Sequence, residues 1–505
     1  MSPAIARLLP LLLPLLLLLP NLGGAPLFDI DEGAFSEATR EMLAKGDYLS
    51  TWLNGNPRFD KPILIYWLQA ISVSIFGVVD WAFRVPSALA AAFWCYAVSR
   101  FAREFIDEEA GKLAGIVALT CLGVQLIGRA ATADALLNLL LTLTITDIWR
   151  YIARESAWAG RRAFLWMGLG ILTKGPIAVL VPGATLFLWC LTSRRWAPLG
   201  KALKDPLSWL LLIGSALPWY IAAYLIHGQA FIDGFFLKHN VQRFSGTLEG
   251  HGGSYYYYLL IVPLMLLPWL PWLGKALAGI REDWQNPVRR FLWLWSGFVI
   301  AFFSLSGTKL PHYALYGCTP LFILIASRHN RLRSPLAGLP LLVLLGLYAA
   351  VPFILPQLNV RDAFYAAQLA RFGSDVQPLG GIWPGIAAIV VATLALMLWQ
   401  VQIWQRVALG ALLGNLVLSL WLAPLFGDLL QGPVKRSGLI AHSMGEPVVQ
   451  WNAHWPSFSV YLQAETAIRE PKPGELAITR SDRLPADAQV EVLRKEGGVM
   501  LVRQQ

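Results

Sequence analysis

Three carboxylates, Asp29, Asp31 and Glu32, stand directly behind a leucine-rich run at residues 8–22. The run has the composition of a segment buried in hydrocarbon, so the carboxylates mark the point where the chain leaves a membrane. Carboxylates at such a surface can accept a proton from a hydroxyl or stabilise a developing positive charge. Alternatively, Asp29 or Asp31 caps the helix that follows, because a carboxylate accepts hydrogen bonds from the unpaired N–H groups of a first turn.

Other acids and several cations fall in short loops further along the chain. They are Arg58, Asp60 and Lys61 in RFDKPILIYW, Arg129 and Asp134 in GRAATADALL, Lys174 in TKGP, Lys238, His239 and Arg243 in FLKHNVQRFSG, and Lys309 and His312 in GTKLPH. Any one of these cations can simply snorkel or contact phospholipid. Their clustering beside Gly and Pro in tight turns favours a site for an anionic group at the membrane surface, most simply a lipid phosphate.

Cofactor motifs are weak in this sequence. His239 and His312 can bind a metal together with Asp60, but no HxxxH or HExxH spacing supports such a site, and phosphate-contacting or structural roles are favoured. A divalent metal at Asp60 and His239 stays possible, and no other cofactor is expected. The sequence has no Walker loop, no GxGxxG in a strand context and no GxSxG elbow. The energy for any reaction must then come from the substrate.

The composition is that of a polytopic membrane protein. Of the 505 residues 56% are hydrophobic and only 14% are charged, and the mean hydropathy is +0.53, whereas soluble domains contain about 25% charged residues. The net charge of +10 reports topology rather than nucleic-acid binding, because Lys and Arg gather on inner loops. All four cysteines lie in apolar runs, so no disulfide framework or zinc ribbon is expected.

Thirteen apolar runs are candidates for membrane spans. They lie near 5–22, 82–101, 112–128, 135–153, 162–173, 176–192, 207–226, 256–275, 291–306, 311–327, 336–356, 381–401 and 405–426. The first resembles a signal peptide, but the many later spans favour an uncleaved helix. A further run at 62–78 is ambiguous, because counting it as a span inverts everything after it. Laid flat as an amphipathic interfacial helix, it leaves thirteen spans.

The distribution of basic residues selects the second arrangement. With the N-terminus inside and 62–78 lying flat, the inner loops hold Arg150, Arg154, Arg161, Arg162, Arg194, Arg195, Lys201, Lys204, Arg281, Arg289, Arg290, Arg328, Arg331 and Arg333, as the positive-inside rule requires. The outer face then carries 27–81, 129–134, 173–176, 227–255, 307–312, 357–380 and the tail after 427. Every motif with possible chemistry lies in these outer segments.

Local patterns predict what positions these motifs. In DEGAFSEATREMLAKGD the apolar residues Phe35, Ala38, Met42 and Leu43 recur at helical spacing, and Gly46 is a stop signal, so a short helix is expected at the outer surface. In the tail, EPVVQWN, ELAITR, EVLRKEGG and VMLVRQQ read as strands around a helix at SFSVYLQAE. We therefore expect a transmembrane catalytic domain at 1–430, with its first outer loop at 27–81, and an outer α/β domain at 431–505.

A family resemblance rests on these segments. The segment DEGAFSEATREMLAKGDYLSTWLNGNPRFDKPILIYWLQAISVSIFG, followed by WAFRVPSALA, resembles the opening of bacterial transferases that add aminoarabinose (4-amino-4-deoxy-L-arabinose) to lipid A, and of the wider protein mannosyltransferase-like (GT-C) superfamily. GRAATADALL, KHNVQRFSG and SLSGTKLPHYALY fit in order, so the resemblance covers most of residues 27–330. The tail agrees loosely, through WPSFSVYL. The implied fold is an all-α polytopic GT-C membrane protein with about thirteen transmembrane helices, juxtamembrane helices in the first outer loop, and a small C-terminal α/β periplasmic domain.

The resemblance also implies a function and partners. Such enzymes are integral to the bacterial inner membrane and transfer a sugar from a polyprenyl-phosphate carrier, such as undecaprenyl phosphate, to an acceptor on the periplasmic side, usually with inversion. The expected acceptor is lipid A or another envelope glycan. Membrane lipids are expected neighbours and nucleic acid is not.

The resemblance assigns roles by motif. Asp31 matches the catalytic acid of the first loop, with Glu32 beside it, and Asp134 matches the acid of the second loop. Lys61 matches the lysine that holds the carrier's phosphate. The remaining expected substrate-binding residues are Arg58, Asp60, Lys174, His239, Arg243, Lys309, His312 and Tyr313. Two positions depart from the family pattern, because Asp60 replaces the usual Glu and His312 replaces a smaller polar residue, and they leave the sugar and the acceptor open.

The expected chemistry is electrostatic. A leaving polyprenyl phosphate gains charge in the transition state, so a fixed Lys61 would stabilise it where water is scarce, together with Lys309 or Arg243. Asp31 would accept the proton of an acceptor hydroxyl or orient the acceptor, and Asp134 would support the positive charge on the sugar. If the acceptor is itself a phosphate, little base is needed and Asp31 mainly positions groups.

Three other readings stay open. The acceptor can be a protein, as for protein O-mannosyltransferases. The chain can be a transporter of lipid-linked sugars, but a transporter would place ionisable residues near mid-membrane, whereas the expected spans are largely free of acids, with Asp147 near an inner end. It can also be a non-catalytic scaffold with an outer binding domain, which would survive loss of Asp31.

Overall fold

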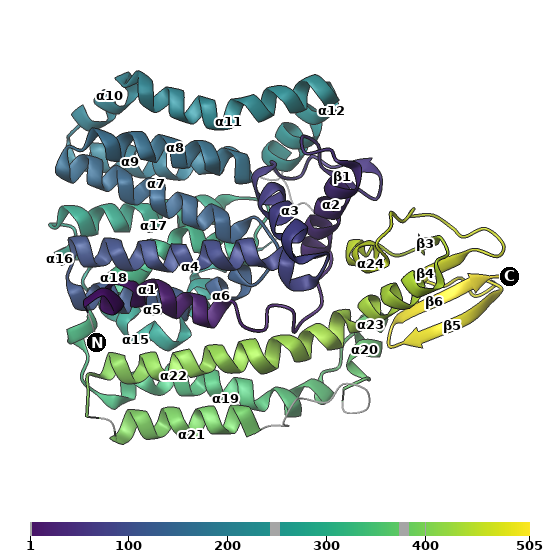
Figure 1. Cartoon of the computed structure of the whole chain (residues 1–505). Helices are drawn as coiled ribbons and strands as arrows, with labels where there is room; N and C mark the ends of the chain where they lie inside the picture. The colour runs from purple at the N-terminus through teal and green to yellow at the C-terminus, as the bar shows by residue number, and fades with distance from the viewer. Residues whose placement is uncertain (1–2, 243–252, 373–382, 399) are drawn as a thin grey trace.

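The computed structural model describes residues 3–242, 253–372, 383–398 and 400–505, and its bulk is a set of helices lying side by side (Figure 1). The longer helices are α1 (Pro3–Leu18), α4 (Asp80–Phe105), α5 (Glu108–Leu119), α7 (Asp134–Arg154), α8 (Ala157–Lys174), α9 (Ile177–Ser193), α11 (Pro206–His227), α17 (Pro287–Leu305), α18 (Leu315–Ala326), α19 (Leu339–Ile354), α21 (Trp383–Leu398), α22 (Ile403–Val417) and α23 (Ala423–Met444).

Shorter helical pieces connect or extend them. These are α6 (Leu122–Gly128), α10 (Ala197–Lys204), α12 (Gln229–Phe231), η1 (Ile232–Gln242), α14 (Tyr257–Met265), η2 (Leu267–Trp269), α15 (Leu270–Ala278), α16 (Ile280–Asp283), η3 (Pro311–Ala314), η4 (His329–Arg331), η5 (Pro335–Gly338), η6 (Leu355–Gln357), α20 (Ala363–Leu369) and η7 (Leu418–Leu422).

Within the described residues, five helical segments are long and apolar enough to cross a membrane, or up to seven when two bent pairs each count as one span. The pairs are α5 with α6, bent by 62°, and α14 with the helical turn and helix that follow it, bent by 85°. They correspond to the expected runs at 112–128 and 256–275. Other expected runs form shorter apolar helices, so the number thirteen stays a prediction.

The break between α5 and α6 is held by polar side chains. The carbonyl of Leu119 accepts hydrogen bonds from Gln125 at 2.6 Å and from Asn415 at 3.0 Å. The indole N–H of Trp269 donates to Thr120 Oγ1 at 2.8 Å. A helix end buried among helices needs such partners for its unpaired carbonyls, and the fold supplies them.

The two ends of the helical bundle carry different elements. The basic α10, with Lys201 and Lys204, lies at one end together with α16, whereas α2 (Asp31–Lys45), α3 (Leu64–Phe76) and the hairpin β1 (Trp52–Leu53) and β2 (Asn56–Pro57) lie at the other (Figure 1). The basic loops are thus separated from the loops with possible chemistry, as the charge pattern predicts.

The first-loop helix α2 forms where the residue spacing predicts it. Phe35, Ala38 and Met42 recur at helical spacing and are buried, and so is every other residue from Glu32 to Met42, so the helix is covered on all sides. Gly46 ends the helix with φ +66°, a left-handed conformation that glycine adopts without strain.

At the start of α2, neither Asp29 nor Asp31 caps the helix by a side-chain hydrogen bond. The N-cap position is Ile30, and no side chain caps the helix by a hydrogen bond. Asp31 lies in the first turn, where its charge is favourable to the helix dipole without satisfying an N–H group. The carboxylates Asp29 and Asp31 therefore remain available for other contacts.

Helix α3 corresponds to the ambiguous run at 62–78. Its 13 residues rise about 20 Å, which is too short for a hydrocarbon core of about 30 Å. Its buried Gln69 accepts a hydrogen bond from Thr39 at 2.8 Å and donates to the carbonyls of Phe83 and Ala131, both at 3.2 Å. One amide side chain thus joins α2, α4 and the loop before α7.

The C-terminal segment forms the small sheet that the sequence predicts. The strands are β3 (Val448–Trp451), β4 (Leu476–Arg480), β5 (Val490–Glu496) and β6 (Val499–Gln504), in the order β3-β4-β6-β5. β3 and β4 are parallel, and the crossover between them contains α24 (Pro456–Leu462), whereas β6 is antiparallel to both neighbours. The expected boundary at 430 falls inside α23, which runs without a break from the bundle toward the sheet (Figure 1).

Candidate active site

A cavity of about 90 Å³ gathers most of the expected site residues. Its walls come from the first turn of α2, the segment after the hairpin, the start of α7, the end of α8 and the turn at 310–313. The lining residues are Asp31, Phe35, Arg58, Asp60, Lys61, Thr132, Ala133, Asp134, Lys174, Leu310, His312 and Tyr313. Segments as far apart in the chain as those of Asp31 and Tyr313 thus meet at one cavity, as the predicted outer loops require.

Asp134 is the centre of the most tightly bonded part of this cavity. Lys174 at the end of α8 forms an ion pair with Asp134 and donates to Tyr316 Oη at 2.9 Å. Tyr316 in turn donates to Asp134 at 3.2 Å, and His312 Nε2 lies 3.6 Å from the same carboxylate. Asp134 is therefore held as an ionised group with a fixed orientation.

The segment after the hairpin supplies two further cations. Arg58 donates to Asp60 at 3.0 Å and to Tyr66 Oη at 2.8 Å, and its guanidinium lies 5.1 Å from the ring centre of Phe35. Lys61 donates to the carbonyl of Asp60 at 3.1 Å. This geometry leaves the ammonium of Lys61 at the cavity wall, where a phosphate can be bound.

Asp31 and Glu32 are consecutive in sequence and have different surroundings. Asp31 is exposed and lines the cavity. Glu32 is buried and forms a two-point ion pair with Arg84, with both N···O distances 2.8 Å. It also accepts the backbone N–H groups of Phe28 at 3.0 Å and Ala131 at 2.6 Å.

These contacts favour a structural role for Glu32, and its expected catalytic role stays a prediction. Both of its oxygens are occupied by protein donors, so it has no capacity to accept a substrate proton without losing them. Glu32 instead ties the first turn of α2 to α4 and to the loop that precedes Asp134. Arg84 extends this tie through the carbonyls of Leu22 and Ala25, both at 2.6 Å, and of Pro26 at 2.8 Å.

A second, larger cavity of about 390 Å³ shares one wall with the first. The shared residues are Asp31, Thr132, Asp134 and His312. The remaining lining residues are Asn21, Leu22, Ala25, Phe28, Asp29, Glu32, Arg84, Gln125, Leu126, Ile127, Arg129, Ala130, Leu418 and Ala423. The carboxylates Asp31 and Asp134 thus lie between a small cavity of mixed charge and a larger one whose exposed surface is mainly apolar.

Two titratable groups beside these cavities have shifted pKa values. Burial raises the pKa of Asp29 to about 7, although two hydrogen bonds from Ser457 oppose the shift. Burial lowers the pKa of His454, and the positive charge of Arg58 adds to that effect. His454 and Ser457 both belong to the C-terminal segment, and the hydrogen bonds from Ser457 to Asp29 show that this segment reaches the site.

Lys309 lies away from the cavity, and two other expected residues fall outside what the structure describes. Lys309 lines neither cavity, because its ammonium donates to the carbonyl of Ser306 at 2.7 Å and lies 5.5 Å from the ring centre of Tyr255. Arg243 lies outside the described residues. His239 belongs to η1, but its side chain also lies outside the described part of the structure.

The possible metal role of Asp60 with His239 therefore stays a prediction. Among the residues that the structure describes, no group of three His, Cys, Asp or Glu side chains is arranged to hold a metal ion.

Sequence reasoning missed two members of the site. Arg84 stands in WAFRVPS at the start of an expected span. A buried arginine there needs a carboxylate partner, so its position indicates a buried ion pair. Tyr316 follows Tyr313 by three residues, so both rings lie on one face of a helical turn. Their partners, Glu32 and Asp134, depend on loops whose meeting only the fold determines.

This arrangement suits the transfer of a group from a lipid phosphate. Lys61 and Arg58 can bind a phosphate, and the carboxylates of Asp31 and Asp134 lie at the same small cavity, where they can handle a proton or a positive charge. With the apolar helices of the bundle, the site defines an integral-membrane glycosyltransferase of the GT-C fold.

Known proteins match this description. A family model described as "Dolichyl-phosphate-mannose-protein mannosyltransferase" matches residues 60–225. The "undecaprenyl phosphate-alpha-4-amino-4-deoxy-L-arabinose arabinosyl transferase" of Edwardsiella ictaluri is 30% identical over 394 residues, covering 75% of this chain and 68% of the relative. The enzyme of the same name from Aeromonas hydrophila is 33% identical over 330 residues, covering 63% of this chain and 59% of the relative.

A solved structure shows the same fold over nearly the whole chain. ArnT from Cupriavidus metallidurans, crystallised with undecaprenyl phosphate, superposes with a TM-score of 0.82 at 20% identity, covering 99% of this chain and 98% of that one. The chain belongs to the family of undecaprenyl phosphate-aminoarabinose arabinosyl transferases.

Proposed function

We propose that this enzyme transfers 4-amino-4-deoxy-L-arabinose from undecaprenyl phosphate to lipid A or a related envelope glycolipid. The observation that carries the proposal is the small cavity in which Lys61, Lys174 and Arg58 surround the carboxylates of Asp31 and Asp134. The names of the relatives supply the sugar and the carrier. The family resemblance in the first loop supplies the acceptor class.

The active site faces the periplasm of a bacterial inner membrane in this proposal. The N-terminus lies inside, thirteen helices span the membrane, and residues 1–430 form the membrane domain with its first periplasmic loop at 27–81. Residues 431–505 form a periplasmic domain. The position of the basic α10 and of α16 at the end opposite α2 supports this orientation (Figure 1).

The donor phosphate binds at Lys61 and Arg58. As the bond between the anomeric carbon and the phosphate oxygen breaks, its electron pair moves to that oxygen, and the two cations stabilise the charge of the departing undecaprenyl phosphate. Asp134, held by Lys174, faces the positive charge that develops on the sugar.

The acceptor approaches Asp31 from the larger cavity. Its mainly apolar lining suits a lipid, and its polar end is the wall of Asp31, Asp134 and His312. An acceptor hydroxyl gives its proton to Asp31 as its oxygen bonds to the anomeric carbon, whereas an acceptor phosphate needs no base. Attack from the face opposite the leaving phosphate inverts the anomeric centre.

A protein acceptor is the second candidate. The family model that matches residues 60–225 describes enzymes with protein acceptors. It includes Lys61 and α7, but neither Arg58 nor the first turn of α2, so it bears on the donor more than on the acceptor.

Mass spectrometry of lipid A and other envelope glycans tests the proposal. Cells would carry the wild-type chain, Asp31→Asn or Lys61→Ala at matched membrane expression, with the exposed Asp487→Asn and Lys112→Ala as controls. An aminoarabinose mass on lipid A with the wild type and the controls, and none with the two site variants, is the expected result. The same glycan profile in all five strains would refute the proposal, and a sugar on protein would favour the second candidate.

A further inference from the structure

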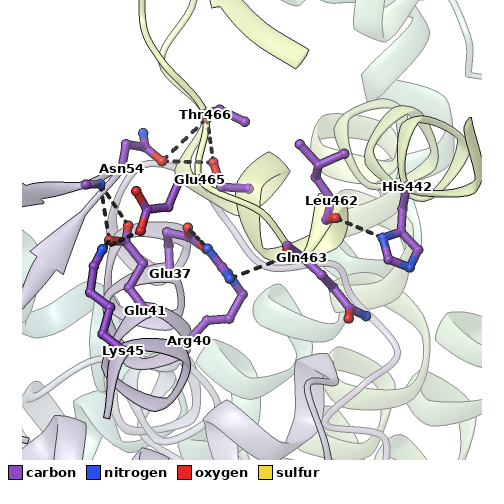
Figure 2. A network of polar contacts seen from close by, with 12 residues as sticks. Glu37, Arg40, Glu41, Lys45, Asn54, His442, Leu462, Gln463, Glu465 and Thr466 are labelled. Atoms are coloured by element: carbon purple, nitrogen blue, oxygen red, sulfur yellow. Dashed lines mark hydrogen bonds and ion pairs between the residues drawn. The ribbon is translucent and has the colours of Figure 1, made fainter. Parts of the chain in front are cut away.

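The C-terminal segment is bonded directly to the first-loop helix α2. Arg40 of α2 forms a two-point ion pair with Glu37 and donates to the carbonyl of Gln463 at 3.4 Å. Lys45, near the end of the same helix, pairs with both Glu41 and Glu465. Figure 2 shows these side chains of α2 pointing at the loop that follows α24.

The hairpin before the donor-binding segment is joined to the same region. Asn54 accepts hydrogen bonds from Ser459 at 2.9 Å and from Thr466 at 3.4 Å (Figure 2). On the other side, His442 of α23 contacts the carbonyl of Leu462 at 2.9 Å. The short helix α24 is therefore packed between α23 and the first outer loop.

The contact closest to the site involves Asp29. Its two carboxylate oxygens accept the backbone N–H of Ser457 at 2.9 Å and the hydroxyl of Ser457. Among the described residues, no lysine or arginine pairs with Asp29. Asp29 is half-buried, its hydrogen bonds from Ser457 fix its carboxylate, and it stands two residues before Asp31.

A second side chain of α24 holds the same stretch. Tyr461 Oη accepts the backbone N–H of Leu27 at 2.7 Å and donates to Asp80 at 2.6 Å. Asp80 also pairs with Lys435. The stretch from Leu27 to Asp29, which leads into α2, is thus fixed at both ends by α24.

Gly33 shows how closely α24 approaches the first turn of α2. A Cβ atom at this position would lie 2.1 Å from Asp29 Oδ1 and 2.6 Å from the backbone nitrogen of Ser457. Any side chain here would push α24 or Asp29 away. The glycine therefore permits the Asp29–Ser457 contact.

The opposite side of the same turn is held by Glu32, through Arg84 and the N–H of Ala131. Asp31 lies between these two attachments and faces the cavities. We propose that Ser457 is a positioning residue for Asp31, acting through Asp29, so that the C-terminal domain completes the geometry of the active site. This inference rests on the proposed function, because it assumes that Asp31 meets the acceptor.

Steady-state kinetics of the purified full chain test the inference, with undecaprenyl phosphate-aminoarabinose as donor and lipid A as acceptor. Ser457→Ala keeps the backbone N–H and loses the hydroxyl. Because a small displacement of a reacting group is costly, we expect kcat to fall about 10-fold or more. The donor KM should stay within about 2-fold, since Lys61 and Arg58 are untouched.

Ser459→Ala is the matched control. Ser459 is on the same helix as Ser457 and is equally buried, but its hydroxyl donates to Asn54 rather than to Asp29. Ser459→Ala therefore removes one buried hydroxyl without removing a contact of Asp29. We expect its kcat within about 2-fold of the wild type. Asp29→Ala should lower kcat as Ser457→Ala does, and the double variant should be no slower than either, because both remove one link.

Three results would overturn the inference. They are an unchanged kcat for Ser457→Ala, an equal loss of kcat for Ser457→Ala and Ser459→Ala, and additive losses in the double variant. Gly33→Ala provides a second route to the same displacement if Ser457→Ala does not fold, and it should lower kcat without raising the donor KM. An inactive wild type would overturn the proposed function, whereas an active wild type with an unaffected Ser457→Ala would overturn this inference alone.

Discussion

Breaking the Glu32–Arg84 pair should destabilise the protein more than any single exposed ion pair in it. The side chains are only 6% and 3% exposed, and Arg84 also donates to three backbone carbonyls. Glu32→Gln keeps the shape and removes the negative charge, which leaves a buried guanidinium without a counter-ion. Removal of one partner of a buried pair costs about 3 to 5 kcal/mol of unfolding free energy.

A double-mutant cycle separates the pair from its surroundings. Arg84→Met leaves Glu32 ionised and unpaired, at a similar cost of about 3 to 5 kcal/mol. The double variant Glu32→Gln with Arg84→Met removes both charges, so its cost should be smaller than the sum of the two single costs by about 1 to 3 kcal/mol.

Equilibrium unfolding in mixed micelles of increasing SDS fraction, followed by tryptophan fluorescence, would give the four unfolding free energies. Arg103→Met supplies a control, because the side chains of its pair with Glu108 are 28% and 58% exposed, and a pair that water reaches in this way should contribute less than about 1 kcal/mol. The reasoning that Glu32 and Arg84 stabilise the protein as a pair would be refuted by either of two results. One is a loss of unfolding free energy in the single variants smaller than that of Arg103→Met, and the other is a double variant whose loss equals the sum of the single losses.

Three further predictions concern other parts of the site. Lys61→Ala should lower kcat/KM for the donor by about 100-fold or more, as loss of a charge-stabilising donor does, and kinetics showing a change below about 3-fold would contradict phosphate binding there. Burial raises the pKa of Asp29 to about 7, above its value of about 3.9 in the unfolded chain, so folding takes up a proton between these pH values. The unfolding free energy of the wild type, relative to that of Asp29→Asn, should therefore fall as pH rises from about 4 to about 7. Melting temperatures of the wild type and Asp29→Asn across this pH range measure the effect. If the melting temperature of the wild type rose relative to that of Asp29→Asn with increasing pH, the prediction would be wrong. Tyr461→Phe removes the hydroxyl between Leu27 and Asp80 and should cost about 1 to 3 kcal/mol of unfolding free energy; an unchanged stability in the same micelle titration would show that Tyr461 does not tie α24 to the first loop.

The local elements of the site could be predicted because they depend on short-range patterns. The spacing of Phe35, Ala38 and Met42 gave the helix, and Gly46 gave its end. The convergence of Lys61, Asp134 and Lys174 was also predictable, since charge bias assigns their loops to one face of the membrane.

The separate roles of Asp31 and Glu32 could not be predicted from spacing. They precede Phe35 by four and three residues, so both lie one turn from the same buried residue and the helical period does not separate them. What separates them is Arg84, which lies 52 residues further along and reaches Glu32 alone. The position of Lys309 could not be predicted from spacing either, because its ammonium donates to the nearby carbonyl of Ser306 and does not line the cavity.

The contribution of the C-terminal segment was equally hidden. Its strands follow from short, mostly apolar segments between turn residues, but its contact with Asp29 joins positions 428 residues apart. A motif such as WPSFSVYL therefore predicts a helix and does not indicate which loop it holds.

In the proposed mechanism Asp31, at the shared wall of the two cavities, and Lys61, in the smaller cavity, serve one transfer reaction. The direct measurement is the reaction of the purified chain in lipid nanodiscs with undecaprenyl phosphate-aminoarabinose and lipid A, with both products quantified by mass spectrometry. We expect the wild type to release undecaprenyl phosphate and to form aminoarabinosyl lipid A in equal amounts, and we expect Asp31→Asn and Lys61→Ala to form neither product. Aminoarabinosyl lipid A formed by Asp31→Asn and Lys61→Ala at the wild-type rate would contradict it.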